Sequence, residues 1–408
     1  MENDNITMHE GWNINKLGSI CTIKKGIQFN KLDLQDAGVY PCINGGIEPS
    51  GWTDLWNTNA ETITISEGGN SCGYVNFIET KFWSGGHCYS LLDINSQIDK
   101  KFLYQALKGK QNFIMDLRVG SGLPNIQQKA IRAFQFIYPI SINEQRKIAE
   151  ILTKVDEAIE NTEALIQKYE RIKVGLMQDL LTKGIDENDN IRSEETHQFK
   201  DSPLGRIPVE WDVNFISKYA HEVVVGIVIK PTQYYIESGV PMLRSQNIKP
   251  GKIIMEDLVY MSEANNDKLG KSKLKENDIV SVRTGYPGVT SIVTKKQAGI
   301  NCIDLVITRI KTNLVNPNYL VNFINSQIGK KQILNQQSGI AQQHFNVGDM
   351  KNLLFFIPSI NEQNKIVKML DKLTDKIESL LNNKSKLQLQ KQGLMQDLLS
   401  GKIRVNYE

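Results

Sequence analysis

The amino-acid sequence predicts an α+β protein in which a mixed α/β globular segment and a long helix each occur twice. Two repeated peptides carry this prediction. The heptapeptide Gly-Leu-Met-Gln-Asp-Leu-Leu occurs at residues 175–181 and again at 393–399, an offset of 218. The pentapeptide Ser-Ile-Asn-Glu-Gln occurs at 141–145 and 359–363 with the same offset, and 20 of the 41 residues from 141 to 181 are identical in the second copy. Similarity at one fixed offset indicates a duplicated structural unit.

Residues 141–185 are expected to hold the first long helix. Ser141 precedes Glu144 by three residues, which is the spacing of a capping box at a helix start. Apolar residues then recur at intervals of three and four, and no Pro or Gly interrupts them before Gly175. This pattern is typical of a long helix that packs on another helix. Residues 358–408 repeat it as a second long helix with a C-terminal tail, although Lys384 and Lys391 interrupt the second apolar stripe.

Residues 1–140 and 211–357 are predicted to form the two globular domains. Both contain short alternating apolar runs that end in glycine-bearing turns, which indicates β-strands and tight turns. Trp211-Asp212-Val213 repeats the pattern of Trp12-Asn13-Ile14, and residues 65–68 resemble residues 282–285, so we expect the globular segment to be duplicated too. Residues 186–210 contain few large apolar side chains and are predicted to be a linker.

Composition and charge are those of a globular protein rather than a membrane or secreted one. The 48 basic and 45 acidic residues give a net charge of +3, but residues 211–357 carry 17 basic and 11 acidic groups. This excess is consistent with a polyanionic partner, and an ordinary lysine-rich surface explains it at least equally well. The five cysteines are dispersed without a Cys-x-x-Cys pair, which is typical of a reducing compartment. Because no run of about 18 apolar residues occurs, we expect a cytoplasmic protein.

Motifs that would indicate an enzyme are absent or incomplete. Gly270-Lys271-Ser272 lacks the upstream glycine of a phosphate-binding loop, because Asn265 occupies its place. Asn316–Tyr319 lacks the second proline of the Asn-Pro-Pro-Tyr motif of amino-methyltransferases, and Glu79-Thr80-Lys81 matches a nuclease spacing that is common by chance. The five histidines show no metal-ligand spacing. The sequence therefore predicts no catalytic residue, no metal site and no cofactor bound by this chain.

Polar loops beside glycines are the candidate binding sites. Their Arg, Lys, Gln, Asn and Ser side chains can hydrogen-bond base edges and phosphates. An ordinary surface turn explains any one of them, but two diverged globules on two near-identical helices favour two different targets on one frame. The candidate DNA-binding residues are Lys24, Lys25, Gln28, Ser66, Asn70, Arg118, Ser121, Arg244, Ser245, Gln246, Asn247, Arg283, Thr284, Gln342, Gln343 and His344.

The whole arrangement resembles the specificity subunits of type I restriction–modification systems. The resemblance lies in Ile142–Ile148, in the heptapeptide, in their second copies, and in residues 201–208 that lead into Trp211. It implies two target recognition domains that each read one half of a bipartite site in double-stranded DNA. It also implies that the long helices pack as an antiparallel coiled coil with pseudo-twofold symmetry. Two modification subunits using S-adenosylmethionine, and optionally two restriction subunits using ATP and Mg, would join this chain, which itself would bind no cofactor.

The heptapeptide has two interpretations. Leu176, Leu180 and Leu181 are expected to be core residues of the helix pair. Identical repetition goes beyond what packing requires, since cores tolerate exchange among Leu, Ile and Met. The candidate residues for docking a modification subunit are therefore Met177, Gln178, Leu181, Met395, Gln396 and Leu399.

Two other functions stay open at this point. One is a scaffold whose paired globules bind proteins or glycans on a coiled-coil spacer, and which would leave no sequence-specific footprint on DNA. The other is a fused restriction–methylation enzyme, which the missing cofactor and catalytic motifs argue against.

Overall fold

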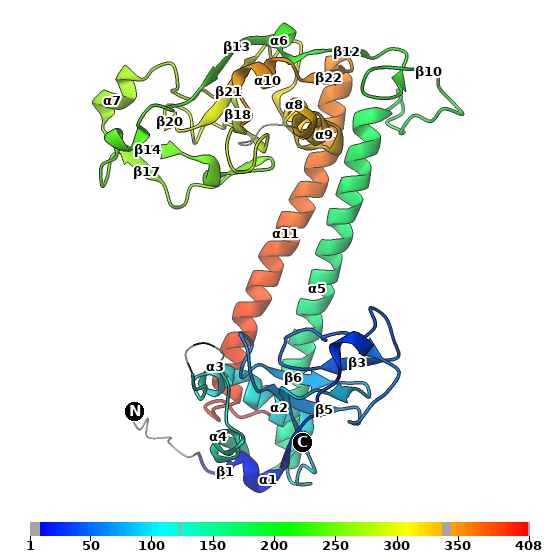
Figure 1. Cartoon of the computed structure of the whole chain (residues 1–408), viewed down its shortest axis with the longest axis vertical. Coiled ribbons are helices and arrows are strands. Elements are labelled where there is room, and N and C mark those ends of the chain that lie inside the picture. Colours follow the sequence, from blue (N-terminus) through cyan, green and yellow to red (C-terminus); the bar gives the residue numbers. More distant parts are fainter. Residues whose placement is uncertain (1–8, 121, 123, 337–343, 407–408) are drawn as a thin grey trace. The chain divides into compact units, whose positions relative to one another are not determined.

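A computed structural model describes residues 9–120, 122, 124–336 and 344–406 of the chain. The chain forms two compact units, Met1–Leu165 with Leu380–Glu408 and Ile166–Ser379. Two long helices, α5 (Ile142–Thr182) and α11 (Ile360–Leu398), each contribute one part to each unit (Figure 1). The predicted α+β class and both long helices are confirmed.

The first unit combines small sheets with short helices. Strands β1 and β9 pair antiparallel, a four-stranded antiparallel sheet has the order β2-β8-β5-β6, and a sheet of order β4-β3-β7 includes a parallel pair, β3 with β7. The strands are β1 (Trp12–Lys16), β2 (Thr22–Lys25), β3 (Tyr40–Ile43), β4 (Trp52–Thr53), β5 (Thr62–Ser66), β6 (Val75–Ile78), β7 (Trp83–Ser84), β8 (Cys88–Leu92) and β9 (Gln135–Pro139). The helices are α1 (Leu17–Ile20), α2 (Lys100–Gly109), α3 (Gln111–Met115) and α4 (Gln128–Ala133), with a 3-10 turn at Lys31–Asp33.

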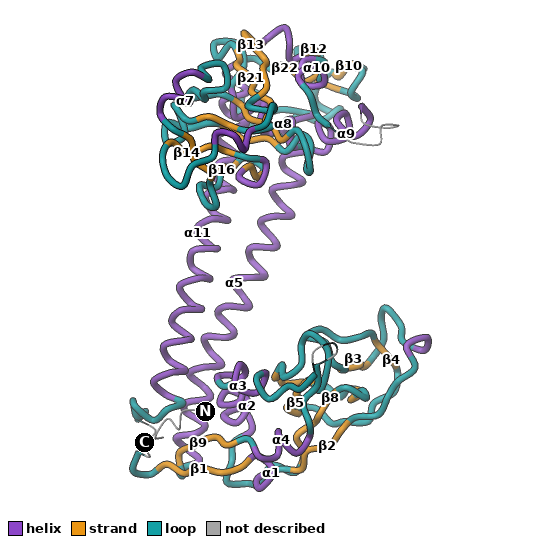
Figure 2. The backbone as a smooth tube through the Cα atoms, turned by 60° about the vertical axis from the view of Figure 1, so that its left-hand side comes forward, coloured by secondary structure: helices purple, strands orange, loops and turns teal. Residues whose placement is uncertain are grey.

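The second unit, like the first, combines short strands with short helices and loops (Figure 2), and it repeats the topology of the first unit. Its β12-β22 pair, its β13-β21-β18-β19 sheet and its β17-β14-β20 sheet correspond strand for strand to β1-β9, β2-β8-β5-β6 and β4-β3-β7. The strands are β12 (Asp212–Phe215), β13 (Ala220–Val225), β14 (Val240–Leu243), β17 (Val259–Met261), β18 (Ile279–Val282), β19 (Thr290–Ile292), β20 (Asn301–Cys302), β21 (Leu305–Ile310) and β22 (Leu354–Ile357). The corresponding helices are α6 (Ile216–Tyr219), α8 (Pro317–Asn325), α9 (Gln327–Gln336) and α10 (Val347–Lys351).

Additional elements of the second unit have no counterpart in the first. They are the short pairs β10 (Phe199–Lys200) with β11 (Ile207–Pro208) and β15 (Ile248–Lys249) with β16 (Lys252–Ile253), the helix α7 (Glu263–Lys268), and a 3-10 turn at Ser245–Asn247. The 3-10 turn at Pro231–Tyr234 does have a counterpart, Lys31–Asp33, because each lies between equivalent strands, β13 and β14 or β2 and β3. The globular segment is therefore duplicated, as the tryptophan-led repeats predicted.

The expected match of residues 65–68 to 282–285 is wrong by one residue. Ser66 exchanges backbone hydrogen bonds with the turn that ends at Gly73 and Tyr74, and Val282 does the same with Gly288 and Val289. Ser66 is thus equivalent to Val282. The turn after Ser66 is one residue longer than the turn after Val282, so matching the two segments by their glycines displaced the alignment.

The long helices lie side by side and run antiparallel within each unit. In the first unit, Asp156 and Glu163 of α5 form ion pairs with Lys391 and Lys384 of α11 at 2.5 and 2.8 Å. In the second unit, Lys173 donates a 2.7 Å hydrogen bond to Thr374. Within the first unit, the partner's number on α11 falls as the number on α5 rises, which confirms antiparallel packing.

These cross-helix contacts also explain the interrupted apolar stripe. Lys384 and Lys391 occupy positions of the apolar stripe, and each forms an ion pair with an acidic side chain of α5. Lys173 and Lys391 are equivalent under the 218-residue repeat, as are Thr374 and Asp156. The Lys173–Thr374 contact is therefore the internal counterpart of the Lys391–Asp156 ion pair.

The heptapeptides pack into the cores of the globular parts. Leu398 is buried in the core of the first unit together with Ile148 and Leu152 of α5. Leu180 and Leu181 are buried in the core of the second unit with Ile366 of α11. Each globule is thus completed by the end of the long helix that does not directly follow it in the sequence. Among the described residues, no helix is both long enough and apolar enough to cross a membrane.

The repeated Asn-Glu-Gln sequence joins each globule to its helix. The Gln145 side chain donates to the carbonyls of Gln97 and Pro139 and accepts from the backbone N–H of Asp99, the N-cap of α2. Gln363 makes the same three bonds with Leu314, Pro358 and Asn316, the N-cap of α8. One buried amide in each copy therefore fixes the helix start to the same point of the globule.

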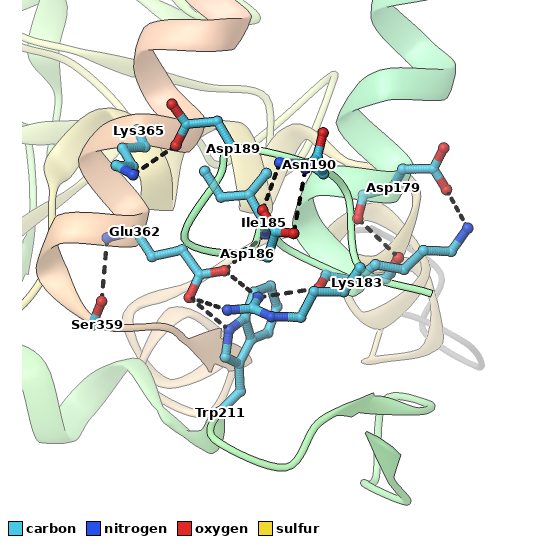
Figure 3. Close-up of polar contacts among 12 residues, drawn as sticks. Asp179, Lys183, Ile185, Asp186, Asp189, Asn190, Trp211, Ser359, Glu362 and Lys365 are labelled. Carbon is cyan, nitrogen blue, oxygen red and sulfur yellow. Dashed lines mark hydrogen bonds and ion pairs between the residues drawn. The ribbon is translucent and has the colours of Figure 1, made fainter. Parts of the chain in front are cut away.

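The neighbouring glutamates hold the segment that follows the opposite helix. Glu362 accepts hydrogen bonds from the backbone N–H of Ile185, from Arg192 and from the Trp211 indole (Figure 3). Glu144 accepts two from Arg404. The expected capping box is half formed: the Ser141 hydroxyl accepts from the Glu144 N–H at 3.4 Å, but the Glu144 carboxylate turns to Arg404 instead.

Candidate nucleic-acid interface

One edge of the four-stranded sheet in the first unit gathers polar loops. Since β8 runs antiparallel to both β2 and β5, the ends of β2 and β5 meet the start of β8 there. Lys25 ends β2, Glu67 follows β5, and His87 precedes β8. Asn125, which also pairs with Val119, reaches the same edge through a bridge to Gly68. Segments far apart in the sequence therefore form one polar surface.

Glu67 is the centre of this edge. Its Oε1 accepts from the Lys25 ammonium at 2.5 Å and from the Tyr89 hydroxyl at 3.0 Å, and His87 Nδ1 lies 3.4 Å from Oε2. Burial and the adjacent Glu67 carboxylate raise the pKa of Tyr89, so its hydroxyl stays protonated and donates. These residues border a cavity of about 500 Å³, lined by Lys25, Gly45, Glu67, Gly68, Gly69, His87, Pro124 and Asn125.

The predicted DNA-binding residues of the first unit differ in accessibility. Lys24, Lys25, Gln28, Asn70 and Arg118 are exposed. Ser66 is buried, and its hydroxyl donates to the Gly45 carbonyl at 2.6 Å, so it supports the loop. Ser121 lies outside the described residues. Of these residues, Lys25 forms an ion pair with Glu67.

The equivalent edge of the second unit has different chemistry. Arg283, which follows β18, forms a 2.7 Å ion pair with Asp304, which precedes β21. Thr284 and His344 are 2.9 Å apart between Oγ1 and Nδ1. The Tyr286 side chain of the same loop is 80% exposed, so this edge faces solvent. Gln342 and Gln343 lie outside the described residues.

Residues 244–247 follow β14 at the neighbouring sheet. Arg244 and Gln246 both donate to the Asp257 carbonyl, at 2.6 and 3.2 Å. Asn247 is buried and donates to the carbonyls of Ile254 and Glu256. Gln246 is exposed, whereas Arg244 and Ser245 are half-buried. Arg244 and Asn247 therefore brace the 254–257 loop.

The docking candidates fall into apolar and polar groups. Met177 packs on the core of the second unit and Leu181 is buried in it, while Met395 and Leu399 pack on the core of the first. Gln178 is half-buried and Gln396 is exposed. Beside them, Gly175 and Gly393 are exposed helix residues, and a Cβ added to either would meet nothing within 4 Å. Each heptapeptide thus presents an open glycine next to a glutamine.

The incomplete methyltransferase motif at residues 316–319 has a structural role. Asn316 caps α8 by accepting from the N–H groups of Asn318 and Tyr319, and the buried Tyr319 hydroxyl donates to the Phe356 carbonyl. Within the described part of the chain, no cluster of three or more His, Cys, Asp or Glu is suited to hold a metal ion. The five cysteines are free and buried, and burial raises the pKa of the Cys88 thiol to about 12.

Sequence reasoning missed several residues that the tertiary structure brings together. Glu67 and His87 lie beside Lys25, and Asp304 lies beside Arg283. Acidic residues were not considered as DNA ligands, although carboxylates can accept hydrogen bonds from base amino groups. The glycine-bearing turn at residues 65–68 was predicted, but a turn signal does not indicate which side chains meet there.

The fold and its polar edges define a protein with two related recognition domains mounted on a duplicated helical frame. Residues 9–171 and 231–390 match the family model described as the type I restriction modification DNA specificity domain. The chain therefore belongs to this family, and its two globules are the target recognition domains of a type I restriction–modification specificity subunit.

One known relative and one solved structure match nearly the whole chain, and a second relative matches about two thirds of it. The type I restriction enzyme MjaVIII specificity subunit of Methanocaldococcus jannaschii is 25% identical, over 97% of this chain and 94% of its own length. A putative type I specificity subunit of Mycoplasma genitalium is 28% identical, over 63% of this chain and 62% of its own length. The crystal structure of a type I S subunit from M. genitalium has the same fold, with a TM-score of 0.66, 20% identity and 98% of both chains covered.

Proposed function

We propose that each recognition domain reads one half of a bipartite site in double-stranded DNA, and that this chain directs partner subunits without catalysing a reaction itself. One observation carries the proposal: the two domains share a strand-for-strand topology but present different polar side chains at the same sheet edge. Two domains with the same topology and different edge residues are suited to bind different DNA sequences. In this proposal the paired helices act as the spacer, because packed helices hold a separation that a flexible linker cannot.

The partner subunits would supply the chemistry. Two modification subunits would methylate adenine with S-adenosylmethionine, and two restriction subunits, where present, would cleave DNA with ATP and Mg. This chain would bind none of these cofactors. The complex would act on DNA in the cytoplasm, and five buried free thiols suit a reducing compartment.

The heptapeptides are the proposed docking sites for the modification subunits. Glycine inside a helix costs about 1 kcal/mol relative to alanine. Gly175 and Gly393 incur that cost in the free chain although nothing within 4 Å needs the space. Close approach by another subunit supplies the reason, and Gln178 and Gln396, three residues further on, lie on the same helix face. Two equivalent sites support two modification subunits.

Methylome sequencing tests the proposed DNA recognition. A host that lacks other methyltransferases would express the full chain with its modification partner. We expect methylated adenine within a bipartite motif, and exchange of residues 12–140 for those of a relative should change one half of the motif only. A contiguous motif, or a change in both halves, would contradict the proposal.

Co-purification tests the docking sites. The double variant Q178K/Q396K should reduce recovery of the modification subunit at least tenfold, while circular dichroism stays unchanged. The matched control is Q167K, the same substitution at an exposed position of α5 outside the heptapeptide. Equal recovery with the double variant and the control would rule out these docking sites.

A further inference from the structure

The two recognition domains carry opposite charges at one equivalent backbone position. Glu67 is the residue after β5, and its carbonyl accepts from the Ile126 N–H at 2.8 Å. Arg283 is the residue after β18, and its carbonyl accepts from the Phe345 N–H at 2.9 Å. Both strands occupy the third place in their four-stranded sheets. Glu67 and Arg283 are therefore equivalent, and the charge is inverted between the domains.

The residue across the sheet edge is inverted in the same way. His87 precedes β8 and lies 3.4 Å from Glu67, whereas Asp304 precedes β21 and pairs with Arg283 at 2.7 Å. The register is fixed independently, because Gly26 donates to the Cys88 carbonyl and Gly226 donates to the Leu305 carbonyl. An acid beside a base in one domain thus becomes a base beside an acid in the other.

One oxygen of Glu67 has no hydrogen-bond donor among the described residues, although the His87 ring lies 3.4 Å from it. Oε1 takes the hydrogen bonds from Lys25 and Tyr89, but Oε2 is buried and accepts no hydrogen bond from the described residues. A buried acceptor without a donor costs about 1–3 kcal/mol. If the Lys25–Glu67 ion pair had only a structural role, we would expect no carboxylate oxygen to be left without a donor.

The space next to Glu67 can admit a ligand group. The cavity of about 500 Å³ is walled partly by glycines. A Cβ at Gly45 would lie 2.8 Å from the Gly68 carbonyl oxygen, and Gly69 has a φ of +80°. Larger side chains would therefore narrow this cavity or strain its wall.

We propose that Glu67 and Arg283 are specificity-determining residues of the two half-sites. Glu67 accepts a hydrogen bond from an exocyclic amino group, either N4 of cytosine or N6 of adenine. Arg283, oriented by Asp304, donates to O6 and N7 of guanine. These are the base edges that a carboxylate and a guanidinium recognise in the major groove. This assignment rests on the proposed function and adds which residue of each recognition domain contacts a base.

The variant E67Q tests the first assignment sharply. The Lys25 ammonium has only donors and contacts Oε1, so it favours the carbonyl oxygen of glutamine at that place. The amide nitrogen then replaces Oε2, which turns an acceptor into a donor. We expect the first half-site to lose preference for cytosine or adenine at one position at least tenfold, and to shift towards thymine or guanine, whose keto oxygens accept.

The experiment is methylome sequencing of the full chain expressed with its modification partner. The wild-type motif shows whether the amino group belongs to cytosine or to adenine. The control Y89F removes the Tyr89 hydrogen bond to Oε1 but leaves Oε2 in place, so the base read by the first half-site should stay the same. The variant R283Q should relax one guanine of the other half-site and leave the first half-site unchanged.

Different results would contradict the proposed function or only the roles of Glu67 and Arg283. No bipartite methylation with the wild-type chain would contradict the proposed function itself. Bipartite methylation with unchanged motifs in both E67Q and R283Q would overturn this assignment alone. A shift in Y89F equal to that in E67Q would also overturn it, because the effect would then come from the support of Oε1. Should E67Q fail to fold by circular dichroism, R283Q decides the matter for the second half-site.

Discussion

Glu362 should contribute most to holding the segment after α5 against the start of α11 in the second unit. Its carboxylate accepts from Ile185 at 2.9 Å, from the Trp211 indole at 3.1 Å and from Arg192 (Figure 3). The side chains of Glu362 and Arg192 are only 11% and 12% exposed. E362A therefore leaves a guanidinium buried without its carboxylate, and removing one partner of a buried pair costs about 3–5 kcal/mol.

Hydrogen exchange measured by mass spectrometry locates this loss. At about 3 kcal/mol, exchange in residues 183–192 and 360–365 should accelerate about 100-fold, if those residues open as a local unit. The double variant E362A/R192A should cost less than the sum of the single variants, because no charge is left unpaired. The matched variant in the first unit is E144A, where Arg404 is 45% exposed and can return to water, so we expect a smaller effect of about 1 kcal/mol.

Two results would refute the reasoning about Glu362. The first is unchanged exchange in residues 183–192 of E362A, which would mean that the buried pair is not coupled to the segment after α5. The second is strict additivity of E362A and R192A, which would mean that the carboxylate and the guanidinium contribute independently.

Three further perturbations test the helix frame. Gly184 has a φ of +62°, and a Cβ there would lie within 2.6 Å of Glu362, Trp211 and Arg192. G184A should therefore destabilise the second unit by more than about 2 kcal/mol in urea unfolding. Gly175 has open space around it, so G175A should instead stabilise the free chain by about 1 kcal/mol. Asp156 forms an ion pair with Lys391 and accepts a hydrogen bond from the buried Gln105. D156A should therefore lower the free energy of unfolding by about 2–3 kcal/mol, and K391A by about 1 kcal/mol. Equal losses in the two variants, measured by urea unfolding, would contradict this. Burial and the nearby Lys391 charge lower the pKa of Lys108 to about 8, so about half of its amine is neutral at pH 8 against under 1% for an ordinary lysine. Amine acylation followed by mass spectrometry should therefore label Lys108 ahead of Lys110 at pH 8, and the rate should fall about tenfold per pH unit below that; equal labelling of both would argue against the lowered pKa.

The helix frame was predictable because its signals are local and periodic. Intervals of three and four residues mark both long helices, and identity at an offset of 218 marks the duplication. Lys384 and Lys391 looked like defects in the stripe, because their acidic partners lie on the other helix, more than 200 residues away. A one-dimensional pattern shows a polar residue at an apolar position but does not show what neutralises it.

The recognition edges were predictable only in part. Lys25 and Arg283 were recognised as polar residues in glycine-bearing loops. Glu67, His87 and Asp304 were not, because their significance comes from the antiparallel order that brings β2, β5 and β8, or β13, β18 and β21, to one edge. The equivalence of Glu67 with Arg283 needed the backbone hydrogen bonds, since the two turns differ in length by one residue.

The sequence by itself determined that this chain is a duplicated frame with two diverged globules, and its repeats led to the correct family. The tertiary structure decided what the repeated Asn-Glu-Gln and heptapeptide segments do. Glu144 meets Arg404 across 260 positions of sequence, and each heptapeptide completes the core of the globule that it does not follow. Helical periodicity is set by neighbouring residues and can be read along the chain, whereas buried ion pairs and completed cores depend on which distant segments the fold brings together.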